Sequence, residues 1–323
     1  MDKSNTFPGK DEILNAADRI SKFIHHTPVL SSENLNTITS THIYFKCENF
    51  QKAGAFKTRG ACNAIFSLDP VQLSRGVCTH SSGNHAAALA RAGKLRNTPV
   101  YIVMPENSSR VKVDAVIQYG GRITFCKPTL QSREDTLSGL INETGAYEIH
   151  PYNDKRIITG QATAALEFFS LIDKLDCVIV PVGGGGLLSG TALAAHYFSS
   201  GAKVFAAEPA GADDAFRSMQ AGKILPSIDP VTIADGLKTS LGSLTFPVIM
   251  KYVDSILTVS EESIIRAMKL IWERMKIVIE PSAATPFAAV LEYPGLFRNK
   301  HLGIILSGGN VDLDSIPWIG NHK

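Results

Sequence analysis

The sequence lacks the patterns that anchor a chain in a membrane, direct its secretion or cross-link it. No apolar run approaches the roughly 20 residues that span a bilayer, and Met1–Lys10 is polar, without the apolar core of a signal peptide. The five cysteines are odd in number and scattered without CxxC spacing, which argues against a disulfide framework and a zinc site. We therefore expect free thiols, a cytoplasmic location and no membrane association.

The sequence also lacks a strong charge of either sign, internal repeats and low-complexity linkers. Its net charge is only +2, and no dense Lys/Arg cluster occurs, so nucleic acid and other acidic polymers are not expected as partners. Hydrophobic residues make up 44% and charged residues 19% of the 323 positions. This composition is typical of an ordered, enzyme-sized protein with two domains.

Short apolar segments alternate with helical patterns along almost the whole chain. This alternation predicts an α/β fold in which mainly parallel sheets are flanked by helices. The expected strands are Ile43–Cys47, Val77–His80, Val100–Met104, Ile123–Cys126, Tyr147–His150, Cys177–Val182, Val204–Ala207, Ile256–Val259 and Leu302–Leu306. The expected helices include Ile13–Phe23, Ala86–Arg96, Val111–Tyr119, Ile157–Leu171, Leu187–Phe198, Glu262–Met275 and Ala283–Leu291. Because the connections are short, the two domains are expected to be interleaved.

The most informative segment is a run of four glycines between a strand and a helix. The glycines follow Cys177–Val182 and precede Leu187–Phe198; they are Gly183, Gly184, Gly185 and Gly186. Successive glycines allow several backbone N–H groups to point at one spot, and the following helix adds the positive end of its dipole. The segment is therefore interpreted as a phosphate site. The alternative is a plain glycine-rich connection.

Two nucleotide motifs are excluded at this loop. A dinucleotide fingerprint requires a glycine at position 188 or 189, where Leu188 and Ser189 stand. A P-loop requires lysine after Gly190, where Thr191 stands. The remaining interpretation is a loop for a small phosphomonoester.

Three further loops follow strands, at the edge where ligands bind in α/β folds. In Gly54–Ala61, Lys57 has apolar and glycine neighbours, which favours a desolvated amine, although a surface lysine is the alternative. Ser81–His85 offers hydroxyls, an amide and free helix-start N–H groups, which suit a carboxylate, although a simple helix cap is the alternative. The third loop is Leu306–Asn310, where a strand runs into a glycine turn.

Taken together, these loops resemble those of fold-type II pyridoxal-phosphate enzymes. The motifs are Ala-Phe-Lys-Thr-Arg-Gly, Ser-Ser-Gly-Asn-His, four glycines and Ser-Gly-Gly-Asn, in this order. The sequence is most similar to the serine racemase and serine/threonine dehydratase family, from Ala17 to Asp312. The resemblance implies two interleaved domains, with residues 1–68 and 154–323 in a large cofactor-binding domain and residues 75–150 in a small one. It also implies a homodimer.

The resemblance assigns roles in binding pyridoxal phosphate and substrate. Lys57 would hold the cofactor as a Schiff base and later act as the base at Cα, and Ser82 would be the acid on the opposite face. The cofactor-binding residues would be Phe56, Lys57, Asn84, Gly183, Gly184, Gly185, Gly186 and Ser307. The substrate-binding residues would be Ser81, Ser82, Asn84, His85, Arg133 and Thr239. Because Ser307 would place a neutral hydroxyl at the pyridine nitrogen, elimination from Cβ is favoured over a full carbanion.

A divalent cation site is implied after the strand Val204–Ala207. The resemblance to the serine racemase branch makes the ligands Glu208, the Ala212 carbonyl and Asp214. Oxygen ligands suit Mg²⁺ or Ca²⁺, with Mn²⁺ also compatible. A solvated acidic loop is the alternative.

The substrate is left open by the sequence. Arg133 matches an arginine of serine racemases and hydroxyaspartate dehydratases, where a guanidinium can pair with a second carboxylate or order a loop; a surface arginine is the alternative. Activation by ATP is also left open, because Lys52 and Tyr119 match the nucleotide-activated racemases whereas Ala87 replaces their glutamine.

The expected function is that of a pyridoxal-phosphate-dependent ammonia-lyase. It would convert L-serine, L-threonine or a related β-hydroxy amino acid to a 2-oxo acid and ammonia, with serine racemisation as a companion activity left open. The alternatives are a threo-3-hydroxyaspartate ammonia-lyase and a catalytically silent pyridoxal-phosphate-binding protein. A nicotinamide dehydrogenase is disfavoured by the glycine pattern.

Overall fold

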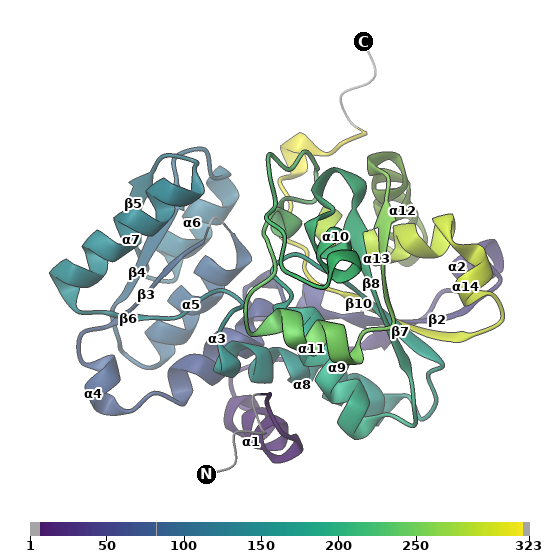
Figure 1. The fold of residues 1–323 in the computed structure, drawn as a ribbon, viewed down its shortest axis with the longest axis horizontal. Helices are drawn as coiled ribbons and strands as arrows, with labels where there is room; N and C mark the ends of the chain where they lie inside the picture. Colours follow the sequence, from purple (N-terminus) through teal and green to yellow (C-terminus); the bar gives the residue numbers. More distant parts are fainter. Residues whose placement is uncertain (1–6, 82, 319–323) are drawn as a thin grey trace.

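The computed structural model describes residues 7–81 and 83–318, which form two sheets with helices against them (Figure 1). The larger sheet has six strands in the order β1-β2-β10-β7-β8-β9, and the smaller has four in the order β5-β4-β3-β6. All pairings are parallel except that between β1 and β2. The prediction of an α/β fold with mainly parallel sheets is confirmed.

The strands of the larger sheet come from both ends of the described chain, and those of the smaller sheet from one stretch between them. The larger sheet contains β1 (Val29–Leu30), β2 (His42–Cys47), β7 (Cys177–Pro181), β8 (Lys203–Pro209), β9 (Ser255–Val259) and β10 (His301–Leu306). The smaller contains β3 (Val77–His80), β4 (Val100–Pro105), β5 (Arg122–Cys126) and β6 (Tyr147–Glu148). The domain boundaries given above remain our proposal.

The helices connect successive strands. They are α1 (Lys10–Ile20), α2 (Glu33–Thr39), α3 (Lys57–Phe66), α4 (Pro70–Leu73), α5 (Asn84–Leu95), α6 (Arg110–Gln118), α7 (Leu130–Thr144), α8 (Lys155–Leu171), α9 (Gly186–Phe198), α10 (Asp214–Ala221), α11 (Thr245–Tyr252), α12 (Glu261–Met275), α13 (Pro281–Glu292) and α14 (Pro294–Phe297). No helix within the described ranges is both long and apolar enough to cross a bilayer.

One expected strand is two residues shorter in the structure, and one observed strand is not expected from the sequence. The expected strand Tyr147–His150 ends at Glu148, because the His150 ring accepts hydrogen bonds from the next turn and the chain leaves the sheet there. The two-residue strand β1 is not expected from the sequence, since it is too short to show an alternating pattern.

Apolar residues on the strands of the larger sheet cover both of its faces. On β7, Cys177 and Ile179 pack in one core with α12 and α13, whereas Val178 and Val180 pack in a second core with α8 and α9. Successive side chains of a strand point to opposite faces, so a sheet covered on both sides requires an unbroken apolar strand. This explains why β7 is readable from the sequence.

Helix α3 lies between the two sheets (Figure 1). Its apolar residues share a core with α5 of the small sheet, and it packs closely on α8. At the crossing with α8, a Cβ added to Gly160 would lie 2.6 Å from the Gly60 Cα. The two glycines thus allow close contact of the helices and fix the first turn of α3 relative to the larger sheet.

Candidate active site

The carboxyl ends of three neighbouring strands carry three of the predicted loops. Lys57 follows β2, Ser307 follows β10, and the glycine run follows β7. The first two loops are joined by the backbone, because the Phe56 N–H donates to the Ser307 carbonyl at 3.0 Å and Ala55 forms a bridge with Gly308. The parallel order of the central strands therefore brings these distant segments together.

Lys57 is the first residue of α3 and is partly buried. Its Nζ donates to the carbonyl of Pro151 at 2.9 Å, across to the loop that follows β6. Burial lowers the pKa of the amine to about 8, against an opposing effect of the Glu280 carboxylate. A larger fraction of the amine is therefore neutral near physiological pH than for an exposed lysine, which makes it a usable nucleophile and base.

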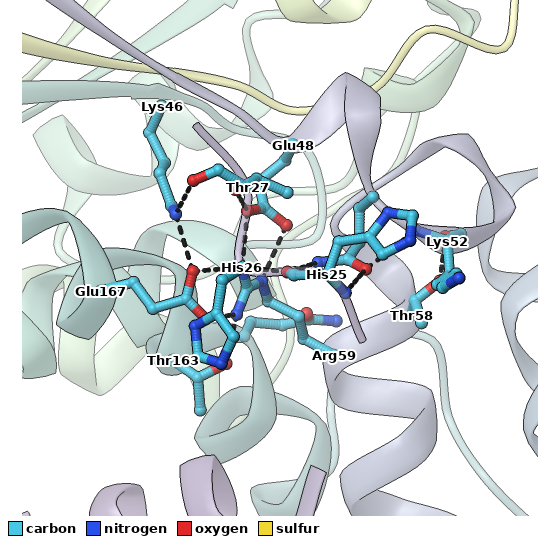
Figure 2. Close-up of polar contacts among 12 residues, drawn as sticks. His25, His26, Thr27, Lys46, Glu48, Lys52, Thr58, Arg59, Thr163 and Glu167 are labelled. Carbon is cyan, nitrogen blue, oxygen red and sulfur yellow. Dashed lines mark hydrogen bonds and ion pairs between the residues drawn. The ribbon is translucent and has the colours of Figure 1, made fainter. Parts of the chain in front are cut away.

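The start of α3 is held by a buried ionic cluster around Arg59, shown in Figure 2. The Arg59 side chain is fully buried, and its guanidinium donates to Glu48 and to Glu167 with four contacts of 2.7–2.8 Å. A fifth donor contact reaches Thr163 at 3.2 Å. The buried Lys46 amine adds a contact of 2.7 Å to Glu167.

This cluster contains two cations and two carboxylates, so their formal charges balance. Burial opposes the charge of Arg59, but its contacts with Glu48 and Glu167 raise the pKa of the guanidinium. Removal of one partner from such a buried pair costs about 3–5 kcal/mol. Because Arg59 is only two residues beyond Lys57, the cluster also limits how far the lysine backbone can shift.

The glycine loop presents unpaired backbone donors. Within the described ranges, the N–H groups of residues 183–186 donate to no protein acceptor. Gly185 has φ +86°, and the Thr245 hydroxyl donates to the Gly184 carbonyl at 2.9 Å, which holds the loop open toward the start of α9. Tyr152 packs directly against Gly184, where a Cβ would meet its ring. The loop thus has the conformation expected for an anion site.

The predicted carboxylate loop lies opposite, on the small sheet. Ser81 follows β3, and Asn84 and His85 begin α5; Ser82 lies outside the described residues. His85 is buried with its Nε2 3.3 Å from the Ile149 carbonyl, and burial lowers its pKa well below the ordinary value. His85 is therefore neutral, with its Nδ1 left without a partner within the described ranges.

Arg133 lies in α7, which packs on the small sheet, and Thr239 lies just after the turn 235–237. Arg133 belongs to the first turn of α7, and its positive charge, together with burial, lowers the pKa of His80, the residue before Ser81. Its Nε is buried and has no partner in the described part of the chain. A Cβ on Gly183 would lie 3.3 Å from the Thr239 hydroxyl, which places Thr239 beside the glycine loop.

Sequence reasoning missed Glu280, His150 and Tyr152 in this site. Glu280 precedes α13 and accepts from Asn84, and the His150 and Tyr152 rings lie with their centroids 4.6 Å apart in the loop after β6. The loop after β6 had a usable signal, because it follows an expected strand as the other site loops do. Glu280 had only a weak one, as a single acid after an apolar segment.

The predicted cation ligands lie between the last residues of β8 and the start of α10. Glu208 and Asp214 are fully buried, and the Glu208 carboxylate accepts the N–H groups of Ala215 and Phe216 at 3.0 and 2.9 Å. Neither carboxylate oxygen of Asp214 has a partner in the described residues. No cluster of three or more His, Cys, Asp or Glu side chains that could hold a metal ion occurs within residues 7–81 and 83–318, and the set of Glu208, the Ala212 carbonyl and Asp214 stays a prediction.

Comparison with known families identifies the family of the chain. The model of the family described as "Pyridoxal-phosphate dependent enzyme" matches residues 20–308, a range that contains Lys57, the carboxylate loop, the glycine run and the first part of the Ser307 loop. The chain belongs to this family. The prediction from the four loop motifs is therefore confirmed.

Individual relatives within this pyridoxal-phosphate family show which of its members the chain is similar to. The chain is 52% identical over 314 residues to a serine racemase from Dictyostelium discoideum, covering 96% of this chain and 97% of the relative. It is 48% identical over 311 residues to a beta-hydroxyaspartate dehydratase from Paracoccus denitrificans, covering 96% and 99%. The solved structure of a T.th. threonine deaminase matches with a TM-score of 0.90 and 40% identity, covering 94% and 99%.

The residues of these loops fit pyridoxal phosphate. The free N–H groups of residues 183–186 suit its phosphate, and the Lys57 amine suits its aldehyde. Ser307 is 3% exposed at the end of β10 and would meet the pyridine nitrogen with a neutral hydroxyl. Phe56, adjacent to Lys57, would pack beside the ring.

Proposed function

We propose that this protein is an ammonia-lyase for small β-hydroxy amino acids, which converts L-serine, L-threonine or a close analogue to a 2-oxo acid and ammonia. Serine racemisation is proposed as a companion activity. The observation that carries the proposal is the partly buried Lys57 amine, placed between an anion loop and a loop suited to a carboxylate. The names of the relatives support it, because they include a serine racemase, a hydroxyaspartate dehydratase and a threonine deaminase.

Each loop has a separate task in this proposal. When bound, pyridoxal phosphate supplies the electron sink that makes the Cα proton of an amino acid acidic. Lys57 accepts that proton, and its lowered pKa suits a base that works near neutral pH. Ser81, Asn84 and the start of α5 bind the substrate carboxylate with hydroxyl, amide and backbone donors.

Replacement of Lys57 tests the proposal. Lys57→Ala is expected to abolish turnover and the absorption band of the lysine–cofactor imine at roughly 410–420 nm. Lys57→Arg is expected to fail as well, because a guanidinium does not form the imine. A panel of L-serine, L-threonine and hydroxyaspartate, assayed for ammonia, keto acid and product chirality, identifies the substrate. Wild-type protein with the band but no turnover would contradict the proposal and leave a silent binding protein.

A second candidate, an ammonia-lyase for 3-hydroxyaspartate, is favoured by Arg133. Its buried Nε has no partner in the described ranges, and its charge lies beside His80 at the edge of the carboxylate loop. A substrate with a second carboxylate would supply the missing acceptor, and bidentate pairing suits a guanidinium.

Arg133→Ala distinguishes the two candidates. If Arg133 pairs with a substrate carboxylate, kcat/KM for hydroxyaspartate is expected to fall by about 30-fold or more, as for a lost charged contact of about 2–5 kcal/mol. The kcat/KM for L-threonine, which has no second carboxylate, is expected to change much less. Equal losses would show that Arg133 only orders the start of α7.

We also propose that Glu208, the Ala212 carbonyl and Asp214 bind Mg²⁺, Ca²⁺ or Mn²⁺. Two fully buried carboxylates lie six residues apart in one turn, and both oxygens of Asp214 lack a protein partner in the described residues. Burial raises the pKa of Glu208 to about 8 and that of Asp214 to about 6, so ionising both groups is costly, and a hard cation with water ligands would offset that cost.

Metal removal tests this site. A chelator is expected to lower the Tm of the wild type, and added Mg²⁺ or Ca²⁺ to restore it, because a cation that binds the native state stabilises it. Asp214→Asn is expected to abolish the response to both while pyridoxal phosphate still binds. If neither chelator nor added metal changes the Tm, the segment from Glu208 to Asp214 is a solvated acidic loop and binds no cation.

We further propose a homodimer in a reducing cytoplasm. All five cysteines are free and buried, which supports a compartment that does not form disulfides. Light scattering on the eluting protein measures the molar mass and tests the dimer.

A further inference from the structure

Glu280 is an ionisable group beside Lys57 and Asn84 to which the mechanism above gives no task. It is 3% exposed and lies before Pro281, where α13 begins. Its backbone N–H donates to the Gly308 carbonyl at 3.0 Å, which ties it to the loop of Ser307. A carboxylate in such a position requires hydrogen-bond partners.

One oxygen of Glu280 accepts the last hydrogen bond in a chain of two side-chain amides, Asn310 and Asn84. A backbone carbonyl at the other end of this chain determines which way each amide is turned. The Asn310 side-chain NH₂ donates to the Ala53 carbonyl at 2.8 Å, which identifies its nitrogen, and it also donates to the Asn84 Oδ1 at 2.9 Å. The Asn84 nitrogen must then face Glu280, and it donates to the Glu280 Oε1 at 2.8 Å. One N–H of Asn84 remains available to a ligand.

The other oxygen of Glu280 has no partner within the described ranges. Charged groups reach Glu280 from three elements: Lys57 from α3, Lys112 from α6 and Asp235 from the turn 235–237. Burial raises the pKa of Glu280 to about 7; Lys112 opposes this effect and Asp235 adds to it. The carboxyl group therefore changes charge in the pH range in which Lys57 must work.

We propose that Glu280 is a positioning residue that makes Asn84 a donor toward an oxyanion of the bound ligand and stabilises positive charge at Lys57. The inference rests on the proposed function, since it takes the ligand to be an aromatic aldehyde with an ionised hydroxyl, as in pyridoxal phosphate. With Oδ1 held by Asn310, Asn84 offers such a ligand the N–H that remains. The Asn84 side-chain amide would then lie between the Glu280 carboxylate and the ligand oxygen.

Glu280→Gln and Glu280→Ala separate the two effects. Glutamine retains an acceptor for Asn84 but removes the charge, so the pH midpoint of the imine absorption band, recorded without substrate, is expected to fall by about one unit, a tenfold change in proton affinity. Alanine also releases the Asn84 amide, so its pyridoxal phosphate Kd is expected to rise about tenfold over that of Glu280→Gln. Glu292→Gln, at the far end of the same helix, is the matched control and is expected to match the wild type.

An unchanged midpoint in Glu280→Gln, or equal Kd values for the two variants, would overturn the inference. If Glu280→Ala does not fold, as judged by its Tm, the midpoint of Glu280→Gln decides alone. Failure of the proposed function is distinguishable, because it appears in the wild type as a missing imine band or as missing turnover.

Discussion

Buried ionisable side chains in this protein fall into two kinds. Arg59 and its partners satisfy one another within the protein, with every guanidinium donor used. Asp214 and Glu280 are instead left with carboxylate oxygens that have no partner in the described residues. A satisfied cluster points to structure, whereas an unsatisfied group points to something that the folded chain binds.

His150 illustrates how one residue sets acid sensitivity. Its Nδ1 accepts the N–H groups of Asn153 and Tyr152, at 2.9 and 3.3 Å, and burial lowers its pKa to about 4. Below the ordinary value near 6.5 the unfolded chain binds more protons than the folded one, so stability falls as pH falls from about 6.5 to 4.

In His150→Asn, the amide oxygen can replace Nδ1 as the acceptor. We expect this variant to lose less stability between neutral and acidic pH than the wild type, by on the order of 2 kcal/mol in the free energy of unfolding. Urea unfolding at pH 4.5 and 7.5 measures it. The exposed His26 offers a control, since His26→Asn removes a histidine of 73% side-chain exposure. Parallel pH profiles for wild type and His150→Asn would contradict the argument.

At the level of elements, the connection from β7 to α9 combines backbone strain with tight packing. Gly185 has φ +86°, which L side chains rarely adopt, and an added Cβ would lie 2.8 Å from the Thr245 hydroxyl. Both features exclude side chains at this position, and both keep the N–H groups of the loop pointing at the start of the helix.

Gly185→Ala is therefore expected to lower stability by about 1–3 kcal/mol and to raise the Kd for pyridoxal phosphate at least tenfold. Absorbance titration and thermal unfolding measure the two effects. Gly222→Ala is the matched control, because Gly222 also has positive φ, +63°, but an added Cβ would meet nothing within 4 Å. The control should lose stability and retain cofactor affinity; equal affinities in the two variants would refute the loop's role.

Some elements of this fold can be predicted from the sequence because their signals are local. The larger sheet and the glycine loop are predictable because β7 is apolar throughout and is followed by an unusual composition. Lys57, Asn84 and Ser307 are predicted as site residues from a related signal, since each belongs to a loop of unusual composition that follows an expected strand. These signals are local in the chain, as are the periods of strands and helices.

Glu280 and β1 are not predictable in this way. Glu280 meets Asn84 at a separation of 196 positions, and nothing near either residue indicates the other. The strand β1 exists only because β2 offers it a partner edge. Tertiary contacts of this kind are decided by the assembled sheets.

At the scale of the whole molecule, an ion pair links a helix that packs on the small sheet to a turn between two strands of the larger sheet. Lys112 of α6 contacts Asp235, which lies in the turn 235–237 near the larger sheet. The lysine side chain is 12% exposed and also lies beside Gly83 of the carboxylate loop. The pair therefore joins a helix beside the carboxylate loop to the turn 235–237 between β8 and β9.

Lys112→Met retains the bulk of the chain but removes the charge, and it is expected to raise the KM for substrate several-fold with little change in Tm. The rise should be smaller at high salt, where the wild-type pair is itself screened. Arg110→Met, two residues earlier in the same helix and at a side chain that is 93% exposed, provides the control. A KM that does not change in Lys112→Met would show that the contact is incidental.

The position of β10 has a consequence for how this protein is made. Its register pairs His301 with His42 on one side, while Leu302 pairs with Cys177 on the other, so a late strand lies between two earlier ones. The small sheet uses one continuous stretch and can form while the ribosome is still translating the rest. The larger sheet keeps β2 and β7 as open apolar edges until β10 emerges, which exposes the nascent chain to aggregation. Cofactor capture must therefore wait for translation of nearly all the residues described here.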